Sequence, residues 1–258
     1  MTILFRASMV GKLMTEPRSK ADGPLSLGAK SAIRDMAAQH ILGIDFETSS
    51  REMEKGIECE SDSIALLNRV LGRGLKKNTT RRNDDELTGE SDLFDAERDD
   101  GFDLKTAWSA ATFPILPDDI GGSQRTLYEW QCRAYMALWD ARRWTVAYAL
   151  VNTPEHLIGY DPPSMHFFDH IPEHMRLTLW TLERDAKLEA LMREKVRHAR
   201  DYYAQVMADF DRTHRLPGAA DAAPGNPPWA GSEGPSTTTA PAVPAPKPTT
   251  AAALAPTF

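Results

Sequence analysis

The stretch Leu87-Thr-Gly-Glu-Ser-Asp-Leu-Phe-Asp-Ala-Glu-Arg-Asp-Asp-Gly-Phe-Asp-Leu-Lys-Thr-Ala-Trp108 decides the fold. Across it, and from about Lys76 onward, apolar residues recur with a period close to two, as in strands that bury one face. The sequence Asp-Asp-Gly at 99–101 supplies a turn between two of these strands. The segment therefore predicts a β-meander in the middle of the chain.

Helical spacing of apolar residues surrounds this meander. The expected elements are helices over 26–42, 50–71, 126–141 and 184–212, and strands over 144–151 and 176–182. Strands that come in runs flanked by helices, without strict alternation, favour one sheet covered by helices. The order predicts an α/β protein of the α+β type, with a central mixed β-sheet flanked by helices.

Composition narrows the possible functions. The chain has 258 residues, 41% of them hydrophobic, a net charge of -7 and two cysteines. The negative charge argues against a generic nucleic-acid coat, and two cysteines cannot build a disulfide framework or a cysteine-ligated iron–sulfur cluster. No apolar run approaches the roughly 20 residues that a membrane span needs. We expect a soluble, intracellular protein.

The chain divides into two parts by composition. Residues 216–258 are rich in proline, alanine and threonine and have few charges, which predicts a disordered tail. Residues 1–215 are expected to form one folded domain.

The central stretch also carries a candidate site. Asp103 and Lys105 are two positions apart, so on a strand both side chains leave the same face. If the preceding strand pairs through the turn, Asp92 comes beside Asp103, and two carboxylates on one face need a cation. Mg²⁺, or Mn²⁺ in its place, suits such an oxygen site, with the Leu104 carbonyl as a further ligand. Lys105 would orient or deprotonate water, or stabilise charge on phosphorus.

Each of these signals has an ordinary structural alternative. An Asp-x-Lys triplet is usually a solvated surface pair. Glu60 follows Gly56 by four residues on the expected helix 50–71, where Gly56 would allow close approach to the sheet; otherwise Glu60 is a surface carboxylate. Gln131 and Tyr135 lie one helical turn apart and suit a phosphate or a base edge; the alternative is partial burial between helix and sheet, which explains Tyr135 equally well.

Several fragments together resemble a known family. They are Phe5-Arg-Ala-Ser8-x-x-Gly11-Lys12-Leu-Met, Met53-Glu-Lys-Gly56-x-x-x-Glu60, Leu87-Thr-Gly-Glu-x-Asp92, Asp103-Leu-Lys105-Thr106-x-Trp108, Tyr128-x-Trp-Gln131-x-x-x-Tyr135-Met and Leu150-Val-Asn-Thr-Pro154. In this order they resemble the PD-(D/E)xK nucleases, in particular the lambda-exonuclease and YqaJ-like viral recombinase type. The resemblance covers most of residues 1–215.

The resemblance implies a restriction-endonuclease-like core and Mg²⁺-dependent hydrolysis of phosphodiester bonds. Carried over by position, Asp92 and Asp103 would be metal ligands, Lys105 the catalytic lysine and Glu60 the acid that supports the metal or its water. Contacts with DNA or its phosphates are expected from Arg6, Ser8, Thr106, Gln131 and Tyr135.

The resemblance also implies a biological setting. It indicates an exonuclease that digests linear duplex DNA from its ends, 5′ to 3′, for phage-type recombination in the cytoplasm of a bacterial host. A single-strand annealing protein is the expected partner, and a trimeric ring the expected assembly. The alternatives are a structure- or sequence-specific endonuclease on the same scaffold and a non-catalytic DNA-binding or assembly module.

Overall fold

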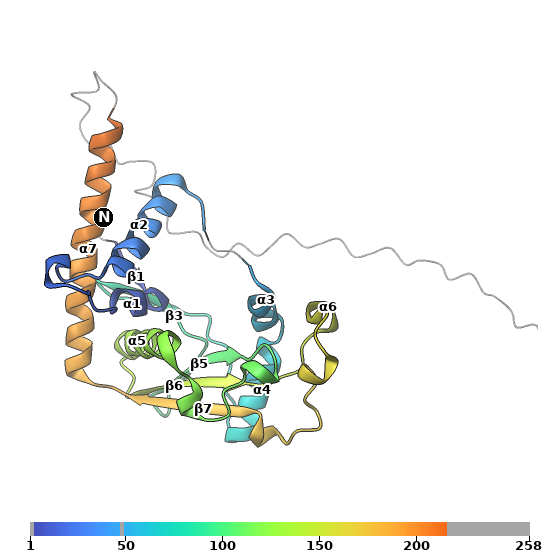
Figure 1. The fold of residues 1–258 in the computed structure, drawn as a ribbon. Helices are drawn as coiled ribbons and strands as arrows, with labels where there is room; N and C mark the ends of the chain where they lie inside the picture. The colour runs from blue at the N-terminus through green and yellow to red at the C-terminus, as the bar shows by residue number, and fades with distance from the viewer. Residues whose placement is uncertain (1–2, 47–48, 216–258) are drawn as a thin grey trace, which may run out of the picture.

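A computed structural model describes residues 3–46 and 49–215 of the chain (Figure 1). The tail expected over 216–258 lies outside the described residues, so the domain boundary at residue 215 stays a prediction. Among the described residues, no helix is both long enough and apolar enough to span a lipid bilayer.

The centre of the fold is a four-stranded sheet in the order β4-β5-β6-β7. Its strands are β4 (Leu93–Asp95), β5 (Asp100–Thr106), β6 (Arg143–Ala149) and β7 (Leu177–Glu183). β4 and β5 are antiparallel, β5 and β6 parallel, and β6 and β7 antiparallel. The central mixed sheet predicted from the sequence is therefore confirmed.

The expected continuous meander is wrong, because its strands divide between two sheets. A second sheet has the order β1-β3-β2 and consists of β1 (Phe5–Arg6), β3 (Leu87–Glu90) and β2 (Arg81–Asn83). Here β3 pairs in parallel with the distant N-terminal strand, a partner that local periodicity cannot reveal. The turn also differs from the one expected over residues 99–101. Asp99 adopts a positive φ of 50°, and β5 already begins at the next residue, Asp100.

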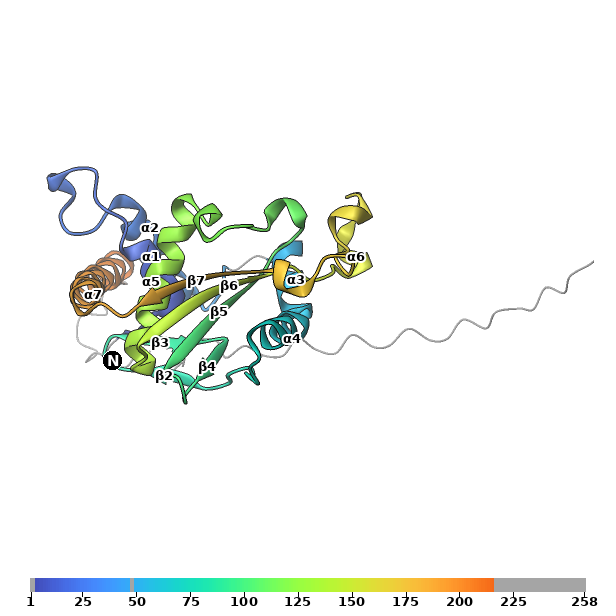
Figure 2. The same cartoon turned by 90° about the horizontal axis from the view of Figure 1, so that it is seen from below.

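Helices cover both faces of the central sheet (Figures 1 and 2). They are α1 (Ala7–Leu13), α2 (Leu27–Leu42), α3 (Arg51–Glu58), α4 (Glu60–Leu71), α5 (Gly122–Trp139), α6 (Glu155–Ile158) and α7 (Ala186–His214). The main core joins α1, α2, α5 and α7 to one face of the sheet through side chains such as Trp144 and Val146. Helix α4 packs on the other face, where Leu67 contacts the cluster that contains Phe102 and Ala147.

The single helix expected over 50–71 is broken. It separates into α3 and α4 at Cys59, whose φ of -95° and ψ of 11° depart from helical geometry. Lys55 in α3 is fully buried and donates to the carbonyls of Ala107 at 2.7 Å and Trp108 at 2.9 Å, so α3 is tied to the loop after β5. A Cβ on Gly56 would meet nothing within 4 Å, so the expected close approach of Gly56 to the sheet is also wrong.

Trp144 requires a glycine on the neighbouring strand. Its partner in the β5–β6 register is Gly101, where a Cβ would lie 2.2 Å from the indole ring. The space left by the missing side chain lets Trp144 stack on Tyr135 of α5 at 5.2 Å between ring centroids. This contact fixes α5 against the face of the sheet that carries Asp103.

Candidate active site

Two aspartates meet where β4 begins. Leu93 pairs with Phe102, and continuing this antiparallel register places Asp92 beside Asp103. The carboxylate of Asp92 accepts a hydrogen bond from the backbone N–H of Leu104, with 2.7 Å between Oδ2 and N. Asp103 is only 1% exposed. The structure therefore brings together the two carboxylates that the sequence singled out.

Asp103 is held by two side chains from the same face. Lys105 Nζ lies 2.7 Å from Asp103 Oδ2 as an ion pair, and this oxygen accepts no hydrogen bond of good geometry among the described residues. Gln131 in α5 donates to the other oxygen, Oδ1, at 3.0 Å. The Lys105 ammonium also lies 4.9 Å from the centre of the Tyr128 ring. Strand β5 and helix α5 thus build the site jointly.

The charges in this cluster influence one another. Burial, together with the charge of Asp103, raises the pKa of Asp92 to about 7. Burial alone would lower the pKa of Lys105, but the neighbouring charges of Asp103 and Asp92 raise it above its usual value. Lys105 is therefore an ammonium in this arrangement, suited to stabilising negative charge and unsuited to accepting a proton.

Glu60 lies in the first turn of α4, close enough for its charge to help raise the pKa of Asp92. It forms an ion pair with Lys77, a residue that the sequence analysis did not select. The hydrogen bond that Lys77 donates to Glu60 raises the pKa of Lys77. Lys77 also forms an isolated bridge with Leu93, and this contact joins α4 to the start of β4.

The donor set suits a hard divalent cation only in part. In favour is the pairing of Asp92 and Asp103, whose mutual repulsion a cation would relieve. Against a closed protein cage, no three His, Cys, Asp or Glu side chains of the described residues converge as metal ligands. Glu60 is engaged by Lys77. The two aspartates are therefore the side chains that could ligate an ion, with its other positions left to the Leu104 carbonyl, water or a substrate.

Gln131 and Tyr135 have different roles: Gln131 contacts the site, whereas Tyr135 is part of the packing. Gln131 contacts Asp103 directly and also donates to the Tyr135 hydroxyl at 3.3 Å. Tyr135 is 6% exposed, donates to the Glu90 carbonyl at 3.1 Å and stacks on Trp144. Its expected contact with a phosphate or a base edge is not supported, because the ring is packed between helix and sheet.

Thr106 lies on the wrong face of β5 for the expected phosphate contact. Side chains alternate along a strand, so Thr106 points away from Asp103 and Lys105. Its hydroxyl is 2.9 Å from that of Ser63 in α4. Thr106 therefore helps to attach α4 to the sheet.

Arg6 and Ser8 are exposed where β1 passes into α1. Strand β1 pairs with β3, Arg6 being opposite Thr88, and β3 ends two residues before Asp92. The two expected phosphate contacts are thus displayed beside the strand that leads into the site.

Sequence reasoning missed the residues that support the site through packing. The Tyr128 ring contacts the Lys105 ammonium, and Trp144 packs against α5. Lys55 donates to the backbone of the loop after β5. A signal existed for Tyr128, which lies at helical spacing from Gln131. No local signal marks Lys55, because a lysine on a short helix is ordinarily solvated.

A comparison with solved structures finds similar chains. A phage-related exonuclease from Haemophilus somnus 129PT has 32% sequence identity and a TM-score of 0.76, with 81% of this chain and 97% of that chain covered. An alkaline exonuclease from Laribacter hongkongensis has 16% identity and a TM-score of 0.57, covering 82% of this chain and 92% of that one. Its complex with dAMP has 18% identity and a TM-score of 0.54, with the same coverage. The latter two show similarity of fold alone.

Comparisons of the sequence alone find no relative. No protein-family model matches the chain, and no curated protein matches it. The relationship of this chain to known proteins therefore depends on the structure comparison, namely the shared fold, the coverage of both chains and the 32% sequence identity to the Haemophilus exonuclease.

Proposed function

The chain belongs to the phage-related exonucleases, of the lambda-exonuclease-like PD-(D/E)xK type, and we propose that it hydrolyses linear duplex DNA from its ends, 5′ to 3′, with Mg²⁺. As a nuclease of this family it is a hydrolase. We propose four further properties: linear duplex DNA as the substrate, Mg²⁺ as the ion, 5′-to-3′ polarity of digestion and a role in phage-type recombination.

One observation carries the proposal. A single face of β5 presents a carboxylate and an ammonium, Asp103 and Lys105, 2.7 Å apart, and Asp92 is fixed beside them by the Leu104 N–H. Two carboxylates with one lysine suit the hydrolysis of a phosphodiester, because negative charge develops on the phosphoryl oxygens during attack by water.

The chain's own residues have separable roles in this reaction. Water attacks phosphorus and gives up a proton, the bond to the leaving oxygen breaks, and that oxygen takes up a proton. Lys105, as an ammonium, stabilises the charge on the phosphoryl group. Gln131 and the Leu104 N–H keep the carboxylates of Asp103 and Asp92 in position.

Asp92 and Asp103 would hold the divalent ion. Glu60 lies nearby and would orient a water on that ion after its ion pair with Lys77 opens. When bound, such an ion supplies a polarised phosphodiester and a more acidic water. Mn²⁺ would replace Mg²⁺ at the same oxygens, because carboxylate, carbonyl and water ligands suit both.

The test is the digestion of four substrates by the full chain: linear duplex with a 5′-phosphate, linear duplex with a 5′-hydroxyl, covalently closed circular duplex and linear single strand. Each is run with Mg²⁺, with Mn²⁺ and with a chelator. We expect loss of the linear duplexes only, dependence on the ion, and faster attack on the phosphorylated end if Arg6 and Ser8 contact that phosphate.

The circular substrate separates the two hydrolytic candidates. An exonuclease leaves it intact, whereas nicking or linearisation would support an endonuclease on this scaffold. Strand-specific end labels then report the polarity, since release of a 3′ label before a 5′ label would contradict 5′-to-3′ digestion.

The assembly and partner are proposed on the family relationship alone. We propose a ring-shaped trimer around the duplex, working beside a single-strand annealing protein in the cytoplasm of a bacterial host. Light scattering on the purified chain tests the trimer, and co-purification with a co-expressed single-strand annealing protein tests the partner.

A further inference from the structure

The ion pair with Asp103 does not by itself fix the direction of the Lys105 ammonium. Lys105 Nζ lies 2.7 Å from Asp103 Oδ2, but this oxygen accepts no hydrogen bond of good geometry from the described residues. A lysine is a point charge on a flexible stem with three rotatable donors. A further contact is therefore needed to keep this ammonium in one place.

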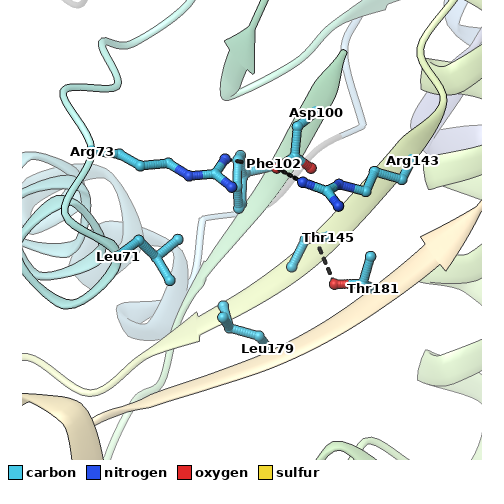
Figure 3. A pocket seen from close by; sticks show the side chains of 8 residues that line it. All are labelled: Leu71, Arg73, Asp100, Phe102, Arg143, Thr145, Leu179 and Thr181. Atoms are coloured by element: carbon cyan, nitrogen blue, oxygen red, sulfur yellow. Dashed lines mark hydrogen bonds and ion pairs between the residues drawn. The ribbon is translucent and has the colours of Figure 1, made fainter. Parts of the chain in front are cut away.

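The buried aspartate on the opposite face of β5 is held more firmly (Figure 3). Arg73 Nη1 and Arg143 Nη2 both donate to Asp100 Oδ2, at 2.6 Å and 3.0 Å. The Arg73 guanidinium also lies 5.2 Å from the centre of the Phe102 ring. Asp100 thus has two hydrogen-bonded cations, whereas the single cation beside Asp103 makes no hydrogen bond of this quality to it.

Two tyrosines flank Lys105. Tyr148 is its partner in the β5–β6 register, so both side chains leave the same face of the sheet. Tyr128 comes from α5, and the centre of its ring lies 4.9 Å from Lys105 Nζ, inside the limit of about 6 Å for attraction between a cation and a ring. The Tyr148 hydroxyl is 3.5 Å from that of Tyr128, and the two rings meet edge to face at 6.4 Å. Strand β6 therefore supports the ring that contacts the lysine.

One side of α5 contacts both members of the ion pair. Tyr128 and Gln131 are three residues apart in this helix, so their side chains are neighbours on its surface. Gln131 donates to Asp103 Oδ1 at 3.0 Å, and the Tyr128 ring lies against the Lys105 ammonium. The helix thus orients the carboxylate through an N–H and the ammonium through a ring.

We propose that Tyr128 is a positioning residue for hydrolysis, whose ring keeps the Lys105 ammonium beside Asp103, where the ammonium meets the charge on the phosphoryl group. The inference rests on the proposed function, which gives Lys105 that task. The negative face of an aromatic ring attracts a cation without supplying a lone pair. The N–H groups of Lys105 therefore stay available to the phosphoryl oxygens.

The experiment changes the electrostatics of the ring and leaves its size nearly the same. In the full chain, Tyr128 is replaced by phenylalanine that carries no, one, two or three ring fluorines, because each fluorine weakens the attraction of the ring for a cation. The same series at Phe102 is the matched control, since that ring contacts the Arg73 guanidinium on the opposite face of β5. Initial rates of duplex digestion give kcat and KM for every variant.

We expect kcat to follow the charge on the ring. Tyr128→Phe keeps the ring and should stay near the wild-type rate, whereas Tyr128→Leu should lose at least about tenfold in kcat, or 1.4 kcal/mol. Across the fluorinated series at position 128, kcat should fall with each fluorine while KM stays constant. The series at Phe102 should leave kcat unchanged.

Unfolding in urea adds a readout that does not depend on hydrolysis. Each fluorine at position 128 should lower the urea midpoint of the otherwise wild-type chain, because the contact with the ammonium is weakened. The same fluorines should have no such effect in the double variant Asp103→Asn with Lys105→Met, which lacks the ammonium and the carboxylate that it neutralises. This dependence on Lys105 separates the contact from general packing of the ring.

The proposal is overturned if kcat is flat across the fluorinated series, or if the Phe102 series lowers kcat equally. A rise of KM with unchanged kcat in Tyr128→Leu would also overturn it, since Tyr128 would then be a DNA contact. So would a fall of kcat without the Lys105-dependent fall of the urea midpoint. Failure of the wild-type chain to digest duplex would instead count against the proposed function, and it would be evident before any variant is measured.

Discussion

The backbone N–H of Leu104 donates to Asp92 Oδ2 at 2.7 Å, so the strand that carries Asp103 also fixes the second carboxylate of the site. A neutral Asn at position 92 keeps an acceptor for this N–H but removes the charge. We expect Asp92→Asn to fold normally and to lose at least about 100-fold in kcat, because removing a metal ligand should cost more than the roughly 10- to 100-fold lost when a group that supports a ligand is removed. Asp99→Asn, at an exposed position in the neighbouring turn, is the control. Rates of duplex digestion check this, and near-wild-type activity in Asp92→Asn would remove Asp92 from the site.

Lys105 and Asp103 allow catalysis to be separated from stability. Lys105→Met leaves Asp103 buried without its counter-charge, which typically costs 3–5 kcal/mol, and removes the charge that stabilises the phosphoryl group, worth about 100- to 1,000-fold in rate. Adding Asp103→Asn to Lys105→Met is expected to restore much of the free energy of unfolding but none of the activity. Urea denaturation and digestion rates measured on both proteins decide. Recovery of activity along with stability would remove both Asp103 and Lys105 from the reaction.

Gln131 is a positioning residue for Asp103. Gln131→Leu conserves volume but withdraws the N–H from Asp103 Oδ1, and we expect activity to fall about 10- to 100-fold. The concentration of Mg²⁺ at half-maximal rate should rise as well, because Asp103 is no longer oriented. This second readout distinguishes positioning from a loss of folded protein, which would lower the rate at every Mg²⁺ concentration without moving the midpoint. Gln131→Glu should be worse than Gln131→Leu, since it adds a like charge beside Asp103.

Gly101 has a packing requirement that Gly56 lacks. A Cβ at Gly101 would lie 2.2 Å from the Trp144 ring, whereas at Gly56 it would meet nothing within 4 Å. We expect Gly101→Ala to lower the free energy of unfolding by about 3 kcal/mol or more and Gly56→Ala, inside α3, to raise it by roughly 0.5–1 kcal/mol. Urea titrations of the two variants test the contrast. Equal effects would contradict the packing described for Trp144.

Lys55 gives the folded protein a pH dependence in the alkaline range. Burial lowers its pKa from 10.5 to about 8. Below pH 8 the lysine is charged in both states, and the folded state bears the full cost of the buried ammonium. Between about pH 8 and pH 10.5 only the unfolded chain keeps the proton, so stability rises with pH across this window and then levels off.

Comparison with Lys55→Met isolates this contribution. The wild-type free energy of unfolding, relative to that of the variant, is expected to rise by roughly 3 kcal/mol between about pH 7.5 and about pH 10.5. Urea titrations at several pH values measure it, with Lys187→Met, at an exposed position, as the control for loss of a positive charge. A difference that stays flat or falls with pH would mean that the two carbonyls bonded to Lys55 hold it as an ammonium.

Patterns with short-range causes could be predicted from the sequence. The helix after Ser26 begins as its cap requires, since Ser26 Oγ accepts the N–H of Ala29 at 3.0 Å. The placement of Asp103 and Lys105 on one face follows from strand alternation alone. The prediction that Asp92 lies beside Asp103 required only that the two strands form a hairpin. It is correct although the turn was misplaced, because the pairing of β4 with β5 sets the register.

Other features depended on partners distant in the chain. The sequence by itself determined the mixed sheet with its flanking helices and the pair of acids with their lysine, because side-chain alternation and capping act over a few residues. Only the tertiary structure decided that β3 joins β1, that α3 and α4 part at Cys59, that Thr106 faces Ser63, and that Glu60 meets Lys77. Each of these outcomes depends on contacts with groups well outside the local segment, and local periodicity carries no information about those contacts.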